Sequence, residues 1–207
     1  MPVVDIVLLD IGGVLTSDPW QSIVLTPGRG LADLLGIERA AAEATGKTLW
    51  PKYSLSVHDE GEYWNEFARS VGCAIPAGLV RSVELKNLEV NSSAKYALVE
   101  LDERSIPWGF ITDNTAFWYR KQLGFLGLSD RRDASLDFPS FECGVAKSSN
   151  GRNLFEVAAA AIDPARTLIV DDRLHNIDRA SQAGFVTLRY SMHDGLGLRD
   201  ALGEFLG

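Results

Sequence analysis

The sequence has few cysteines, no excess of basic residues and no long apolar run. Its two cysteines, Cys73 and Cys143, are too few for a disulfide scaffold and lack metal-ligand spacing, so we expect buried or unreactive thiols. The 20 basic residues are outnumbered by 28 acidic ones, a net charge of −8 that argues against nucleic-acid or membrane partners. No secretory signal opens the chain, and no apolar segment approaches the ~20 residues that span a bilayer. These absences predict a soluble, globular, cytoplasmic protein.

The first notable feature is an apolar run from Val3 to Leu9 that ends in Asp10. Apolar at nearly every position and rich in Val and Ile, the run predicts a strand buried on both faces of a parallel sheet. Asp10 then lies at the carboxyl end of the strand, where open α/β sheets bind ligands. Gly12 and Gly13 permit a sharp turn and a close approach of the backbone to a ligand. The alternative is that Asp10 is only a turn residue.

The remaining pattern predicts an α/β fold with a doubly wound parallel sheet. Unlike the run before Asp10, residues 17–88 contain no strand-like apolar runs and instead show helical periodicity, which indicates a small inserted helical domain. From Asn91 onward, helical and strand patterns alternate, as in crossover units of a parallel sheet. We therefore expect a core of residues 1–16 and 89–207, with 17–88 inserted.

Individual elements follow from apolar periodicity and from capping residues. We expect helices at 30–35, 49–55, 58–71, 77–85, 91–104, 115–126, 152–162, 176–183 and 196–206. The expected N-caps are Asp59 for 58–71 and Asn91 or Ser92 for 91–104, and the helix over 115–126 should end near Gly124 or Gly127. Later strands are expected at 108–111, 133–138, 167–170 and 185–190. Several side chains of 17–88 are candidates for a substrate-facing surface, although aromatic residues at helical spacing more commonly belong to a core. These are Trp20, Arg29, Trp50, Tyr53, His58 and Tyr63.

Polar residues recur at or just after the ends of the first four strands. They are Asp10, then Thr112 with Asp113, then Lys147, then Asp171 with Asp172. Because the carboxyl ends of parallel strands share one edge of a sheet, we expect these side chains to lie together. Each also has an ordinary interpretation: a lysine exposed on the surface, a threonine that ends a strand, and paired acids that cap a helix.

In order and residue type, the segments DIGGVL, FITDN, GVAK and LIVDDRLHNIDRASQAG resemble the four motifs of the haloacid dehalogenase (HAD) superfamily of hydrolases. The last segment, with its DDxxxNIxxAxxAG pattern, is the most specific. The resemblance implies a Rossmann-like core with a helical cap after the first motif, where 17–88 lies. It also implies that the first and fourth strands are neighbours, so that Asp10 and Asp172 meet at the topological switch point.

The resemblance assigns roles that the chemistry of phosphate esters supports. A doubly negative phosphate monoester must be neutralised and positioned before a carboxylate can attack it. Asp10 would be the nucleophile, and Mg²⁺ would be held by Asp10, Asp172, the backbone carbonyl of Gly12 and, through water, Asp171. Substrate phosphate would be bound by Lys147, by the Thr112 hydroxyl and by the Asp113 amide.

The sequence departs from the family pattern at Gly12. Most phosphatases of the superfamily have an aspartate there that protonates the leaving group, a contribution of about 10²–10⁴ in rate. A smaller departure is Ser148, where proline is common. We expect a magnesium-dependent hydrolase of small phosphorylated metabolites, with sugar phosphates among the candidates, acting through an aspartyl-phosphate. The alternatives are a 2-haloacid dehalogenase and a catalytically weak or silent protein that binds a phosphorylated ligand.

Overall fold

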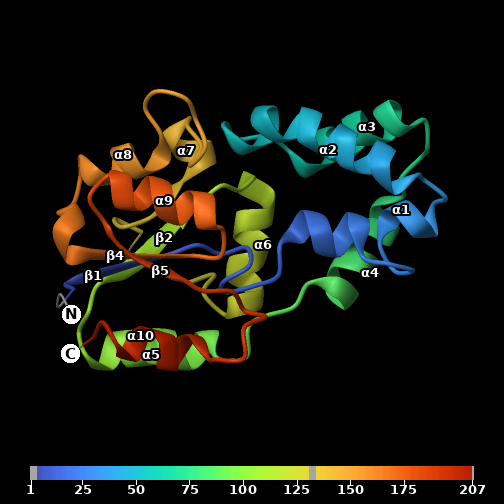
Figure 1. Ribbon diagram of the computed structural model, residues 1–207. Coiled ribbons are helices and arrows are strands. Elements are labelled where there is room, and N and C mark those ends of the chain that lie inside the picture. The colour runs from blue at the N-terminus through green and yellow to red at the C-terminus, as the bar shows by residue number, and fades with distance from the viewer. Residues whose placement is uncertain (1–3, 131–133, 207) are drawn as a thin grey trace.

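A five-stranded parallel sheet in the order β3-β2-β1-β4-β5 forms the centre of the fold (Figure 1). The coordinates are a computed structural model that describes residues 4–130 and 134–206. The strands are β1 (Ile6–Leu9), β2 (Trp108–Thr112), β3 (Phe138–Pro139), β4 (Thr167–Asp171) and β5 (Val186–Arg189). β1 pairs with β2 on one side and with β4 on the other, so the predicted neighbourhood of the first and fourth strands is confirmed.

Helices cover both faces of the sheet, which confirms the doubly wound α/β class (Figure 1). Successive side chains of a strand point to opposite faces. Val7 and Leu9 accordingly belong to one hydrophobic cluster, with α5 and α10, whereas Leu8 belongs to another, with α8 and α9. The bounds are α5 (Ala94–Glu103), α6 (Ala116–Leu126), α8 (Leu154–Ala159), α9 (Leu174–Gln182) and α10 (Leu198–Gly203).

The third strand differs from its prediction over 133–138. Residue 133 lies outside the described residues, residues 134–137 form a turn, and β3 occupies only Phe138–Pro139. The reason lies in the side chain of Asp137, whose Oδ1 accepts a hydrogen bond from the Phe110 backbone N–H at 3.1 Å. Its Oδ2 accepts another from the Tyr119 hydroxyl at 2.8 Å. Side-chain acceptors thus replace the backbone ladder that the strand prediction assumed.

The elements within 17–88 are all helical, as predicted. They pack around a hydrophobic cluster of their own, which α6 joins through Phe117 and Trp118. The two ends of this segment lie side by side, because Ser17 N–H donates to the Glu89 carbonyl at 2.9 Å and Ser17 Oγ accepts from Glu89 N–H at 3.0 Å. The elements are the π-helical η1 (Gln21–Leu25), α1 (Leu31–Leu34), α2 (Arg39–Ser54), α3 (Glu60–Val71) and α4 (Ala77–Asn87).

Helix α2 begins ten residues earlier than the 49–55 prediction and includes both Gly46 and Pro51. Glycine and proline usually weaken a helix interior, which is why the sequence pattern indicated only its last part. Gly46 has a packing reason, since a Cβ there would lie 2.2 Å from the Trp20 ring. The indole therefore lies directly against the backbone of α2.

The helix ends agree with the predicted capping chemistry in two cases. Asp59 is the N-cap of α3 and accepts from the Gly61 N–H at 2.7 Å. Gly127, one of two candidates, ends α6 in the left-handed conformation. The N-cap of α5 is Ser93 rather than Asn91 or Ser92, although the Asn91 side chain accepts a hydrogen bond from the Ser93 N–H at 3.0 Å.

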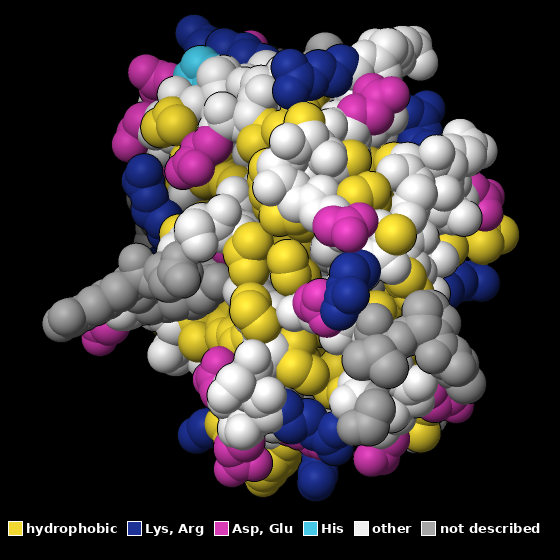
Figure 2. Space-filling view, turned by 90° about the vertical axis from the view of Figure 1, so that its left-hand side faces the viewer, with side chains coloured by type: hydrophobic (Ala, Val, Ile, Leu, Met, Phe, Trp, Pro, Cys, Tyr) yellow, Lys and Arg dark blue, Asp and Glu magenta, His cyan; other side chains and the backbone are white. Residues whose placement is uncertain are grey.

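The face at the amino ends of the strands shows basic and acidic side chains interspersed among hydrophobic ones (Figure 2). Positive charge therefore does not gather on this face of the described chain. Among residues 4–130 and 134–206, the helices are all too short or too polar to cross a bilayer.

Candidate active site

Asp10 lies directly beyond β1, at the carboxyl edge of the sheet. Asp10 is 8% exposed, and its Oδ1 accepts a hydrogen bond from the Ile11 N–H at 2.8 Å. The turn that follows needs Gly13, which has φ +81° and whose Cβ would lie 2.5 Å from Asp172 Oδ2. A side chain is therefore excluded at Gly13 for both conformational and steric reasons. The glycine turn allows the Asp172 carboxylate to approach the backbone beside Asp10.

Lys147 reaches this edge from the loop between α7 (Ser140–Cys143) and α8, and its ammonium lies between two carboxylates. Nζ is 3.0 Å from Asp10 Oδ2 and 2.6 Å from Asp171 Oδ2. The side chain is 1% exposed, so the alternative of a surface lysine is wrong. Burial by itself would lower the pKa of Lys147, but Asp10 and Asp171 outweigh burial and raise it above its ordinary value.

The acids that end β4 have different surroundings. Asp171 is fully buried and accepts hydrogen bonds from the Asn176 side chain at 2.9 and 3.0 Å and from the Arg173 N–H at 2.9 Å. Asp172 is partly buried, and its Oδ1 is buried with no hydrogen-bond partner among the described residues. The N-cap of α9 is Arg173, so the paired acids are not themselves the helix cap. Asp172 therefore retains an oxygen for another ligand.

Asp10, Asp171 and Asp172 form a cluster that suits a hard cation. Each offers one carboxylate oxygen, and these oxygens all lie within 4.8 Å of one another. Burial raises the pKa of Asp10, and the Lys147 charge lowers it only in part. The pKa of Asp172 is also raised, first by burial and then by Asp171. An oxygen-liganded divalent cation would relieve this crowding of negative charge and would match both the donor set and the unpartnered oxygen of Asp172.

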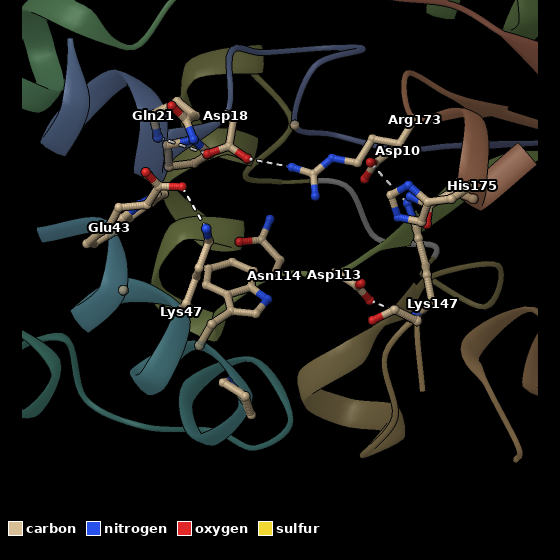
Figure 3. A pocket seen from close by; sticks show the side chains of 18 of the residues that line it. Asp10, Asp18, Gln21, Glu43, Lys47, Asp113, Asn114, Lys147, Arg173 and His175 are labelled. Carbon is tan, nitrogen blue, oxygen red and sulfur yellow. Dashed lines mark hydrogen bonds and ion pairs between the residues drawn. The ribbon is translucent and has the colours of Figure 1, made fainter. Parts of the chain in front are cut away.

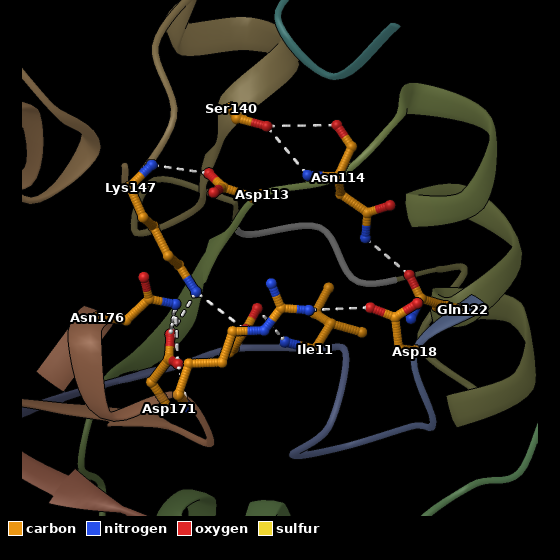
Figure 4. Close-up of polar contacts among 11 residues, drawn as sticks. Ile11, Asp18, Asp113, Asn114, Gln122, Ser140, Lys147, Asp171 and Asn176 are labelled. Carbon is orange, nitrogen blue, oxygen red and sulfur yellow. Dashed lines mark hydrogen bonds and ion pairs between the residues drawn. The ribbon is translucent and has the colours of Figure 1, made fainter. Parts of the chain in front are cut away.

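The end of β2 supplies the remaining predicted residues, Thr112 and Asp113, of which Figure 4 shows Asp113 beside Lys147. Asp113 Oδ1 accepts a hydrogen bond from the Lys147 backbone N–H at 2.8 Å and so fixes the loop that carries the lysine. The Thr112 hydroxyl is buried and close enough to Asp10 to lower its pKa, but no described residue forms a hydrogen bond of normal geometry with it. Next along the chain, Asn114 Nδ2 donates to Gln122 Oε1 at 2.7 Å, which ties the strand end to α6. The structure thus brings all the predicted strand-end residues to one edge.

A cavity of about 340 Å³ opens onto Asp10 and Lys147 (Figure 3). One wall is the carboxyl edge of the sheet, with the Gly12 turn, and the other is the face of α2 together with the segment that precedes η1. Trp20 and Trp50 line it, and both also pack against the hydrophobic cluster of 17–88, so each has a cavity-facing and a core-facing side. The cavity is large enough for a small metabolite, and its walls provide both aromatic and charged groups.

The other substrate-facing candidates lie elsewhere. Tyr53 and Tyr63 are buried in the hydrophobic cluster of 17–88, so for them the core alternative is correct. His58 lies in a separate shallow depression, with its Nε2 2.9 Å from Ser56 Oγ. Arg29 is absent from the described lining of the cavity, and its carbonyl accepts from the Asn87 side chain at 3.1 Å.

Sequence reasoning missed the charged residues that complete the cavity wall. They are Asp18, Glu43, Lys47, Arg173 and His175. Two signals were available: Asp18 closely follows the first motif, and Arg173 directly follows the paired acids. Glu43 and Lys47 form an ion pair of 2.8 Å on α2, but the length of that helix was underestimated. Which of its side chains face the site depends on how α2 packs against the sheet.

Comparison with known proteins finds similarity in structure alone. The sequence matches no protein-family model, and it matches no curated protein at a significant level. A predicted HAD-like family hydrolase from Porphyromonas gingivalis is 20% identical, with 93% of this chain and 94% of that chain covered and a TM-score of 0.69. A HAD family enzyme from Bacteroides thetaiotaomicron, in complex with magnesium and inorganic phosphate, is 16% identical. The match covers 92% of this chain and 96% of that chain, with a TM-score of 0.64.

A third similar structure is L-2-haloacid dehalogenase from Xanthobacter autotrophicus with chloropropionic acid covalently bound. It is 15% identical, with 98% of this chain and 82% of that chain covered and a TM-score of 0.61. At these identities the similarity establishes the fold. This chain therefore has the fold of the HAD-like hydrolases, as its motifs predicted, and the same fold carries both phosphatase and dehalogenase chemistry.

Proposed function

We propose that this protein is a magnesium-dependent hydrolase of small phosphorylated metabolites that uses Asp10 as its nucleophile. The observation that carries the proposal is the buried contact of Lys147 with Asp10 and Asp171, beside an Asp172 oxygen that has no described partner. A buried lysine and a cluster of acids at the mouth of a cavity suit a substrate that is doubly negative and a cation that helps to bind it. The neighbour crystallised with magnesium and inorganic phosphate supports this choice.

Asp10, Asp172 and the Gly12 carbonyl would hold Mg²⁺, with Asp171 acting through water. The unpartnered oxygen of Asp172 and the oxygen-only donor set fit such an ion. Bound there, it would supply positive charge to the phosphoryl oxygens. Asp171 suits the indirect role because its carboxylate already accepts from Asn176 and contacts the Lys147 ammonium.

The chemistry follows from the positions of the protein's own groups. A carboxylate oxygen of Asp10 attacks phosphorus, the bond from phosphorus to the leaving oxygen breaks, and that oxygen takes a proton from solvent water, because Gly12 offers no acid. Water then attacks the phosphorus of the aspartyl-phosphate, the bond to Asp10 breaks, and inorganic phosphate is released. Lys147 Nζ, 3.0 Å from Asp10 Oδ2, orients the nucleophile and offsets the charge of the phosphoryl group. The Thr112 hydroxyl and the Asp113 N–H provide further hydrogen bonds to it.

Residues 17–88 act in this proposal as a cap over the phosphoryl site. The support is geometric, since the two ends of the segment lie side by side and α2 forms the cavity wall that faces Asp10. Cap residues would then contact the organic part of the substrate, which makes Trp20 and Trp50 candidates for specificity. A sugar or another compact polar group is compatible with a cavity of about 340 Å³.

A second candidate activity is 2-haloacid dehalogenation, which also begins with attack by an aspartate. Gly12 favours it, because a halide leaving group needs no proton, and a dehalogenase is among the similar structures. The acid cluster argues against it, since carbon–halogen cleavage by Asp10 has no use for a hard cation beside the nucleophile.

The test is an assay of purified protein against a panel of phosphorylated metabolites, p-nitrophenyl phosphate and 2-chloropropionate, with Mg²⁺ or with EDTA. Phosphate release that requires Mg²⁺, and that the nearly isosteric variant Asp10→Asn lacks, would support the proposal. Chloride release in EDTA would establish the dehalogenase. If neither product forms while the protein still binds inorganic phosphate, the chain is a phospho-ligand-binding protein without turnover.

A further inference from the structure

The guanidinium of Arg173 reaches into the cavity close to Asp10 (Figure 3). One of its nitrogens, Nη2, lies 3.2 Å from Asp18 Oδ2 across the cavity, and the two side chains are 55% and 32% exposed. Among the described residues, no other group accepts a hydrogen bond from the Arg173 side chain. A guanidinium has five N–H donors, so most of this residue's capacity to bind an anion is unused.

The base of Arg173 is held firmly even though its tip is exposed. Its backbone N–H donates to Asp171 Oδ1 at 2.9 Å, and the residue is the N-cap of α9. The backbone is therefore anchored to the same carboxylate that contacts Lys147. In contrast, a single exposed ion pair such as the one with Asp18 contributes little stability and is easily exchanged for another anion.

The charges around Asp10 indicate why a second cation is needed. Lys147 is already in contact with both Asp10 and Asp171, and Asp113 and Asp172 lie close by, so carboxylates outnumber cations at this edge. A divalent cation would balance the protein's own acids but not an incoming phosphate dianion. Arg173 also lines the cavity near Asp10, but unlike Lys147 it forms its ion pair with a partly exposed carboxylate, that of Asp18.

We propose that Arg173 leaves Asp18 and binds the phosphoryl group of the substrate and of the product, a role that rests on the proposed function. A guanidinium matches two phosphoryl oxygens with two parallel hydrogen bonds, which an ammonium cannot reproduce. Arg173 is then a substrate-binding residue that adds a second basic side chain, besides Lys147, to the phosphoryl site.

The experiment compares Arg173→Gln and Arg173→Lys with the wild type and with Arg166→Gln. Arg166 is a matched control because it is also an exposed arginine paired with one aspartate, Asp5, but lies before β4 at the opposite edge of the sheet. Titration calorimetry measures the Kd of inorganic phosphate with Mg²⁺ present, and assays with p-nitrophenyl phosphate give KM and kcat. Magnesium affinity without phosphate and the melting temperature are measured for each variant.

We expect Arg173→Gln to raise the Kd for phosphate and the KM roughly 10- to 100-fold, the effect of losing charge-assisted hydrogen bonds. Arg173→Lys should recover part of the loss, and Arg166→Gln should match the wild type. Magnesium affinity and melting temperature should stay unchanged, which separates phosphate binding from a structural role. If Arg173→Gln binds phosphate like the wild type, the inference is wrong while the proposed function stands. If the wild type neither binds phosphate nor hydrolyses esters, both fail.

Discussion

Replacing Lys147 by methionine tests the electrostatic design of the site most directly. Methionine keeps the length of the stem but removes the ammonium, so the carboxylates of Asp10 and Asp171, at 3.0 and 2.6 Å from Nζ, lose their shared cation. Removing one partner of a buried ion pair typically costs about 3–5 kcal/mol, because the remaining charge is left uncompensated. For a domain of this size each kcal/mol lowers the melting temperature by about 2–4 °C, so we expect a decrease of about 6–20 °C.

The loss should depend on pH, and its direction follows from Asp10. Burial holds the pKa of Asp10 above its ordinary value even with Lys147 present, and without the ammonium it must rise further. A carboxyl with a raised pKa binds its proton more tightly in the folded protein than in the unfolded chain. Its contribution to stability is therefore present at low pH and is lost as pH rises through the folded pKa. The deficit of Lys147→Met should thus be smaller near pH 5 than near pH 8.

The assay is thermal denaturation in EDTA, followed by circular dichroism, for the wild type, Lys147→Met and Lys47→Met. Lys47 lines the same cavity, but its side chain is 76% exposed, so its replacement should leave the melting temperature nearly unchanged. A Lys147→Met protein that melts within about 2 °C of the wild type near pH 8 would refute the reasoning, since the two carboxylates would then need no counter-charge.

Three further predictions concern neighbouring residues. Asp172→Asn should retain the fold but weaken magnesium binding at least tenfold in titration calorimetry, because it neutralises the carboxylate whose Oδ1 has no described partner. An unchanged magnesium affinity would show that Asp172 is not a metal ligand. Gly12→Asp should fold normally, since its Cβ would meet only the Asp18 Cα at 3.7 Å and the backbone is not left-handed. It should speed cleavage of alkyl phosphates more than of p-nitrophenyl phosphate, because it supplies a proton to poor leaving groups. Equal rates for wild type and variant across leaving groups would show that another group already donates the proton. Gly13→Ala should lower the melting temperature and the magnesium affinity together, because the φ of +81° disfavours a side chain and the 2.5 Å approach of Asp172 leaves no room for a methyl group. A stable, metal-binding Gly13→Ala protein would show that the turn tolerates a side chain.

Much of the fold could be predicted because its signals are local. The apolar run before Asp10 and the runs at 108–111 and 167–170 are short and strongly apolar, so their type was correct. Their carboxyl ends were correct to within one residue, since β2 includes Thr112 and β4 includes Asp171, whereas β1 begins only at Ile6. The predictions failed where tertiary contacts replaced local preference. Asp137 supplies side-chain hydrogen bonds where a strand was expected, and Gly46 in α2 is explained by the ring of Trp20.

The sequence by itself determined which residues reach the edge of the sheet. Asp10, Lys147 and Asp171 each lie at the end of a strand or in the segment after it, and in a parallel sheet all such positions lie at one edge, whatever the details of packing. The same reasoning placed Asp172 beside them. Those positions depend only on the order of the strands and on where each one ends.

Only the tertiary structure decided how these groups share charge and what faces them. The distances from Lys147 to Asp10 and Asp171 depend on the loop held by Asp113, and the ion pair between Asp18 and Arg173 joins segments far apart in the chain. Such contacts are set by how helices and loops pack, because side-chain reach and burial cannot be derived from local periodicity. The order of the residues along the chain therefore indicates the chemistry, and packing determines which cation is free to meet a substrate.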